Sequence, residues 1–134
     1  MDTAPVLLYV EDDISSIKVM RMLVEKVMKL PLHVFQGSDR FMEKLKALDQ
    51  APDLFLLDIH MSPHDGFELL WMLRSNRQYR NKKVIAVTAS VMGDEIELLK
   101  KSGFDGAISK PLNISIFPGL IKSILDNESV WFIA

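Results

Sequence analysis

The segment Leu54-Phe55-Leu56-Leu57-Asp58 is a run of four apolar residues followed directly by a carboxylate. A run of this kind, without polar alternation, is typical of a strand buried on both faces, as in a parallel sheet covered by helices. Two further runs share the pattern, Val6–Val10 and Val84–Val87. The sequence therefore favours an α/β fold in which Asp58 lies where a buried strand ends.

Short apolar runs alternate with segments of helical period along the chain. The runs are 6–10, 32–35, 54–57, 84–87 and 106–109. The helical segments are 14–28, a stretch capped by Ser38, a stretch after Gly66, 94–102 with Gly103 ending it, and 117–125. Strands and helices that alternate in this way predict an open sheet of five parallel strands with right-handed crossovers and five helices.

Composition sets limits on the class of protein. A chain of 134 residues fits one domain, which we expect over 1–134 with a core of about 5–126 and an apolar tail of 127–134. With 16 Lys+Arg against 18 Asp+Glu, bulk positive charge for nucleic acid or a membrane surface is lacking. The absence of cysteine excludes disulfides and thiolate chemistry. No signal peptide or membrane span is legible, so a cytoplasmic protein is expected.

Chemically distinctive side chains follow four of the predicted strands. Glu11 and Asp12 follow the first, Asp58 the third, Thr88 the fourth and Lys110 the fifth. Because parallel strands end at one edge of a sheet, these groups should meet there. Clustered carboxylates favour a hard cation such as Mg²⁺, Ca²⁺ or Mn²⁺. A lysine and a hydroxyl beside them suit phosphoryl oxygens, which indicates phosphoryl transfer.

The resemblance to a known family rests on four short motifs in order. The chain resembles the receiver domain of response regulators, whose fold is flavodoxin-like with strand order 2-1-3-4-5. The likeness extends from Val6 to about Leu125. The motifs are Val10-Glu11-Asp12-Asp13, Leu57-Asp58-Ile59-His60-Met61 with Asp65-Gly66, Val87-Thr88-Ala89 and Lys110-Pro111.

The resemblance implies a role for each matching residue. Asp58 would accept a phosphoryl group from a histidine kinase or a histidine phosphotransfer protein. Mg²⁺, with Mn²⁺ as a substitute, would be bound by Asp58, by Asp12 directly, by Glu11 mostly through water and by the main-chain carbonyl of His60. The hydroxyl of Thr88 would bond to the phosphoryl group, and Lys110 would pair with Asp58 and then with its phosphate. Asp13 lies outside the matching pair, and we expect it to be a helix cap.

Function is accordingly expected to be that of a stand-alone receiver, which promotes its own phosphorylation and dephosphorylation but is not a turnover enzyme. Phosphorylation would switch the binding of a downstream protein. The family docks partners on the face of the fourth helix, fifth strand and last helix, where a homodimer could also form. Neither nucleic acid nor membrane is expected as a partner.

Two departures from the family pattern leave alternatives open. Ser62 stands where proline is usual, and Ala107 replaces the usual aromatic residue. These changes support a second reading, a pseudo-receiver that binds partners without phosphorylation. A hydrolase with Asp58 as nucleophile is a third, but His60 stands where a second acid would be expected. The tail of Trp131 and Phe132 would either cover its own domain or contact a partner.

Overall fold

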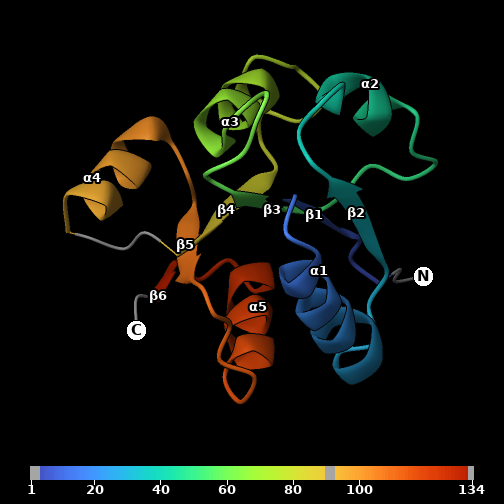
Figure 1. Ribbon diagram of the computed structural model, residues 1–134, viewed down its shortest axis with the longest axis vertical. Helices are drawn as coiled ribbons and strands as arrows, with labels where there is room; N and C mark the ends of the chain where they lie inside the picture. Colours follow the sequence, from blue (N-terminus) through green and yellow to red (C-terminus); the bar gives the residue numbers. More distant parts are fainter. Residues whose placement is uncertain (1–3, 90–92, 133–134) are drawn as a thin grey trace.

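The computed structural model describes residues 4–89 and 93–132, and its centre is one parallel sheet (Figure 1). Six strands lie in the order β2-β1-β3-β4-β5-β6. Their bounds are β1 Leu7–Glu11, β2 Leu32–Gln36, β3 Leu54–Asp58, β4 Lys83–Thr88, β5 Gly106–Ser109 and β6 Val130–Phe132. All five neighbouring pairs are parallel, as the buried apolar runs predicted.

The prediction of five strands was wrong, because the tail adds a sixth. Val130, Trp131 and Phe132 pair in parallel with Gly106, Ala107 and Ile108 of β5. A three-residue segment has too little periodicity to be distinguished from a loop in the sequence. Its strand character comes from the free edge of β5, whose unpaired main-chain groups it satisfies. In this structure the tail therefore covers its own domain.

Helices cover both faces of the sheet, with α1 and α5 on one side and α2, α3 and α4 on the other (Figure 1). Their bounds are α1 Ile14–Arg21, α2 Phe41–Lys46, α3 Gly66–Arg74, α4 Gly93–Ser102 and α5 Phe117–Leu125. The first continues as a π-helical turn, η1, over Met22–Val27. Within the described residues, no helix is long and apolar enough to cross a membrane.

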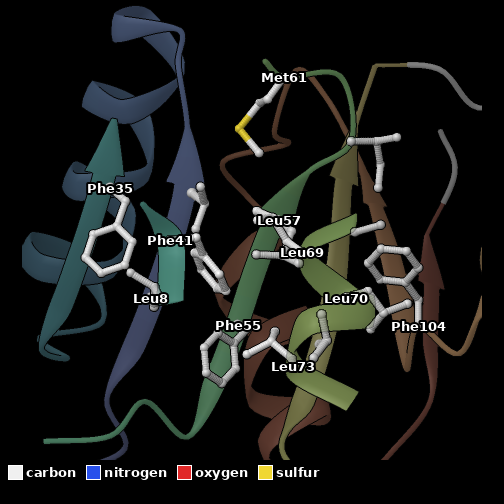
Figure 2. Close-up of a cluster of buried hydrophobic side chains, with 14 of the residues drawn as sticks. Leu8, Phe35, Phe41, Phe55, Leu57, Met61, Leu69, Leu70, Leu73 and Phe104 are labelled. Atoms are coloured by element: carbon white, nitrogen blue, oxygen red, sulfur yellow. The ribbon is translucent and has the colours of Figure 1, made fainter. Parts of the chain in front are cut away.

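The buried side chains form one cluster on each face of the sheet. Figure 2 shows the cluster beneath α2, α3 and α4, which includes Phe41, Leu69 and Phe104 together with Leu57 of β3. The other cluster lies beneath α1 and α5 and includes Phe117 and Ile121. With a close-packed layer on both faces, the strands cannot shift independently, so the positions of their carboxyl ends are well defined.

Two helix boundaries that were predicted from single residues differ in outcome. Gly103 ends α4 with a φ of 107°, as predicted for a C-terminal glycine. Ser38 was predicted to cap α2, but the N-cap is Arg40 and the hydroxyl of Ser38 accepts a hydrogen bond from the His64 main-chain N–H at 2.9 Å. A buried hydroxyl satisfied by a distant loop is not visible in local spacing, which explains the error.

Candidate functional site

The carboxyl ends of β1, β3 and β4 bring three polar residues to one edge of the sheet. Glu11, Asp58 and Thr88 are the last residues of these strands, and each is at least 96% buried, with exposed fractions of 0%, 4% and 1%. Lys110 follows β5 directly, and its main-chain N–H donates to the carbonyl oxygen of Thr88 at 2.9 Å. The sheet thus gathers four of the five residues that the strand-end argument placed together, and the fifth, Asp12, directly follows Glu11.

Lys110 lies between the two buried carboxylates and pairs with both. Its Nζ is 2.7 Å from Oε1 of Glu11 and 3.3 Å from Oδ1 of Asp58. The sequence predicted the contact with Asp58, whereas the shorter contact is with Glu11. One ammonium group therefore faces two carboxylates, and the buried centre has a formal deficit of positive charge.

Glu11 is held by donors on both of its oxygens. The Tyr9 hydroxyl donates to Oε1 at 2.8 Å. The main-chain N–H groups of Asp12 and Asp13 point at Oε2, at 3.1 and 3.3 Å. The sequence analysis missed Tyr9, which was grouped with the apolar strand. The available signal was alternation, since residues two apart on a strand share a face.

These contacts separate the acidities of the two carboxylates. Burial, together with the facing Glu11, raises the pKa of Asp58 to about 6, although Lys110 opposes the shift. Burial also opposes the ionisation of Glu11, but hydrogen bonds from Lys110 and Tyr9 prevail and lower its pKa. Burial works against the charged Lys110 as well, yet both carboxylates raise its pKa. The metal-free site is thus short of positive charge at Asp58.

The donor set fits a hard divalent cation. Oxygens of Glu11, Asp12 and Asp58 all lie within 4.8 Å of one another. Asp12 is exposed at the rim, while the other two are buried, so a cation entering from solvent would meet Asp12 first. Carboxylate oxygens without imidazole or thiolate are the ligands that Mg²⁺ prefers. Three carboxylates and one ammonium group leave the site with a formal charge of about −2. The two positive charges of such a cation would balance it.

The side chains of Asp13 and His60 are not among those of the acidic cluster. The carboxylate of Asp13 accepts from the main-chain N–H and the hydroxyl of Ser16 at 2.9 and 2.7 Å, which makes it the N-cap of α1. This was its predicted role. His60 is exposed and lines a cavity of about 130 Å³ beside Thr88, between the β3–α3 loop and α4. Its carbonyl as a metal ligand stays a prediction.

Gly66 allows α3 to begin close to the end of β3. Its N–H donates to the carbonyl of Ile59 at 2.9 Å. A Cβ added at Gly66 would lie 2.7 Å from the main-chain oxygen of Asp58, so only glycine allows α3 to begin against that strand end. Asp65 caps the helix and forms a capping box with Glu68. The turn after Asp58 is therefore anchored on both sides.

Comparison with known proteins gives the same class as the geometry. The model of the response regulator receiver domain family matches residues 7–121. The polar-differentiation response regulator DivK of Brucella ovis is 34% identical over 120 residues, which are 87% of this chain and 92% of that protein. DivK of Brucella anthropi has the same identity and coverage. The chain belongs to the response regulator receiver domain family of two-component signalling.

Solved structures support the fold independently. The receiver domain of a DNA-binding response regulator (merR) from Colwellia psychrerythraea aligns with a TM-score of 0.79 at 23% identity, over 91% of this chain and 98% of that one. A CheY-like receiver domain from Methanospirillum hungatei gives 0.79 at 22% identity, over 93% and 96%. At these identities the likeness concerns the fold, and site roles depend on this chain's own residues.

Proposed function

We propose that this receiver domain accepts a phosphoryl group on Asp58 from a phosphohistidine of a histidine kinase or phosphotransfer protein, with the help of Mg²⁺. The observation that carries the proposal is the placement of Asp58. The residue is 4% exposed, and its carboxylate lies 3.3 Å from Lys110 in a cluster of three acids at the carboxyl edge of the sheet. A buried carboxylate with no role would be costly to maintain.

The chemistry is an exchange of one bond at phosphorus. An oxygen of the ionised Asp58 carboxylate attacks the phosphorus of the donor and an acyl phosphate forms. The phosphorus–nitrogen bond breaks, its electron pair goes to the imidazole nitrogen, and that nitrogen takes a proton from solvent. Bound Mg²⁺ supplies positive charge against the phosphoryl oxygens. Glu11, Asp12 and Asp58 would hold it, with Mn²⁺ as a substitute and with the His60 carbonyl as a further ligand.

Lys110 and Thr88 are proposed to receive the phosphoryl oxygens. The ammonium group of Lys110 already lies within 4 Å of Asp58 and also pairs with Glu11. Thr88 ends the neighbouring strand, where its register partner on β5 is Ser109, the residue before Lys110. A new dianionic group would attract both residues, which begin the segments that lead from β4 to α4 and from β5 to α5.

A donor protein must reach Asp58 over the rim of the sheet, and the surface there is suited to protein contact. A hollow of about 250 Å³ lies between α1 and the segment after β5, and Lys110 contributes to its wall. Ile114 lines this hollow and is 56% exposed, and Ile14 at the start of α1 is 55% exposed. Apolar side chains of this size beside a reactive site fit a partner rather than solvent.

The test is intact-mass spectrometry after incubation with acetyl phosphate or phosphoramidate. We expect one added phosphoryl group that requires Mg²⁺ and is removed by hydroxylamine, as an acyl phosphate is. Asp58→Asn should remain unlabelled, while Asp13→Asn, which keeps a capping residue outside the cluster, should be labelled like the wild type. Wild-type protein that stays unlabelled would refute the proposal and favour a receiver that binds partners without phosphorylation. Labelling of Asp58→Asn would refute Asp58 as the acceptor.

A further inference from the structure

The edge of β5 is built to receive another strand at close range. A Cβ on Gly106 would overlap the carbonyl oxygen of Val130 and would lie 3.0 Å from Cδ1 of Ile85. Glycine at this position therefore lets the main chain of β6 approach. Beside it, Ala107 is fully buried and carries only a methyl group. The edge thus offers main-chain donors and acceptors together with room for one large side chain.

Trp131 fills that room. It pairs in register with Ala107, packs against the cluster beneath α2, α3 and α4, and is half-buried. The Nζ of Lys100 on α4 lies 5.2 Å from the centre of its ring, a cation–π distance. Val130 and Phe132 alternate to the opposite face and join the other cluster. The surface thus recognises an extended segment with an aromatic residue at its middle position.

The tail contacts this surface through a short strand only. β6 has three residues, and the four residues that connect it to α5, 126–129, are all exposed. A strand of three residues at the edge of a sheet opens locally at low free-energy cost. The segment stays in place largely because its tether keeps it at high local concentration, on the order of millimolar for a short linker. A segment on another protein can therefore compete once its own affinity is sufficient.

We propose that the edge of β5 together with α4 is a strand-addition site for an extended, aromatic-containing segment of a partner protein, and that β6 is its intramolecular competitor. Strand addition uses main-chain hydrogen bonds for affinity and alternate side chains for specificity. Here Gly106 and Ala107 supply the edge and the space, and Lys100 supplies the contact that selects an aromatic ring. The proposal concerns a surface away from Asp58 and does not depend on phosphorylation.

The test is an NMR titration of the full chain with a peptide of residues 126–134, Asp-Asn-Glu-Ser-Val-Trp-Phe-Ile-Ala. Trp131→Ala weakens the competitor and leaves the edge intact. We expect this variant to bind the peptide about tenfold more tightly than the wild type or better, since truncation of a half-buried tryptophan weakens the tail by that order. The affected amides should be those of 106–108 and of the last turn of α4.

A second substitution separates the edge of β5 from other surfaces. Gly106→Ala in the Trp131→Ala background should abolish peptide binding, because the new Cβ stands where the incoming main chain must lie. Trp71→Ala, which removes a tryptophan that is 71% exposed on α3, is the matched control and should behave as wild type. Equal peptide affinity in wild type and Trp131→Ala, retained binding after Gly106→Ala, or no binding to any variant would each overturn the proposal.

Discussion

Strand β5 leads into two regions that are held together by opposite kinds of force. At its carboxyl end Lys110 enters a buried acidic centre, where one ammonium group lies 2.7 Å from Glu11 and 3.3 Å from Asp58. Along its side β5 pairs with a three-residue strand whose side chains pack against the two apolar clusters. The first region depends on charge and pH, while the second depends on shape and on a tether. Substitutions in one should therefore leave the other largely unaffected.

The largest contrast is expected between two lysines. Lys110→Ala should slow labelling by acetyl phosphate about tenfold or more, because a charge-assisted hydrogen bond to the phosphoryl oxygens is lost. It should also move the pH midpoint of labelling upward, since Lys110 lowers the pKa of Asp58. Lys100→Ala, which removes the cation over Trp131, should label at the wild-type rate. Equal slowing in both variants would contradict the separation of the two regions.

The pKa of Asp58 predicts a stability effect that only the acidic region shows. Its folded pKa of about 6 exceeds the usual 3.8, so the folded state binds the extra proton and loses stability as pH rises from about 4 to about 6. Asp58→Asn lacks this loss and should be more stable than metal-free wild type at pH 7, by at most about 3 kcal/mol. Urea unfolding at pH 7 and below pH 4 measures it.

The urea unfolding experiment has one control in the acidic centre and one at the edge of β5. The advantage of Asp58→Asn should disappear below pH 4, and Mg²⁺ at pH 7 should reduce it by stabilising the wild type alone. Trp131→Ala should lower stability by a similar amount at both pH values, because the Trp131 ring packs against an apolar cluster. An Asp58→Asn advantage that is independent of pH would show that the site is not short of positive charge.

Metal binding should distinguish two adjacent aspartates. Asp12→Asn removes a rim carboxylate of the cluster and should weaken Mg²⁺ binding several-fold, with Glu11→Gln milder. Asp13→Asn should change the affinity by less than about twofold, because that carboxylate caps α1. Asp13→Ala should instead cost about 1 kcal/mol of stability through the lost cap. A Mg²⁺ titration in which Asp13→Asn has the largest effect would reverse the assignment of the two residues.

The smallest effect is expected where the two regions meet. Ala107 is fully buried and faces Trp131 in register, so Ala107→Tyr should displace the Trp131 ring while labelling of Asp58 stays at the wild-type rate. In a Trp71→Phe background Trp131 is the remaining tryptophan, and its emission should shift to longer wavelength as it enters water. An unshifted emission would mean that Trp131 does not occupy the space above Ala107.

The sequence predicted the acidic site far better than the edge of the sheet, for a physical reason. The site can be recognised in the sequence because carboxylates, a lysine and a threonine directly follow apolar runs. Few reasons other than function place such groups there. Their partners are less legible. Glu11 is the nearer partner of Lys110, and the Tyr9 hydroxyl donates to Glu11. Both contacts depend on how side chains from the ends of β1 and β5 meet in space. Residue type alone does not carry that information.

The sixth strand could not be read from local pattern. Val130-Trp131-Phe132 is apolar throughout, which fits a docked tail and a partner contact equally well. What decides between them is Gly106, which admits the main chain of the tail, and Ala107, which leaves space for Trp131. Both positions lie more than twenty residues earlier in the chain. The sequence showed that position 107 lacks the family's usual aromatic side chain. It did not show that the tail places the ring of Trp131 beside that position.

The most direct test of the central claim is to locate the phosphoryl group on the chain. Borohydride reduces an aspartyl phosphate to homoserine, which is stable to digestion and marks the acceptor permanently. After labelling with acetyl phosphate and Mg²⁺, peptide sequencing by tandem mass spectrometry should find homoserine at position 58. It should be absent when Mg²⁺ is omitted. Homoserine at position 12 or 13 instead, or no homoserine in protein that carries the added phosphoryl mass, would contradict Asp58 as the acceptor.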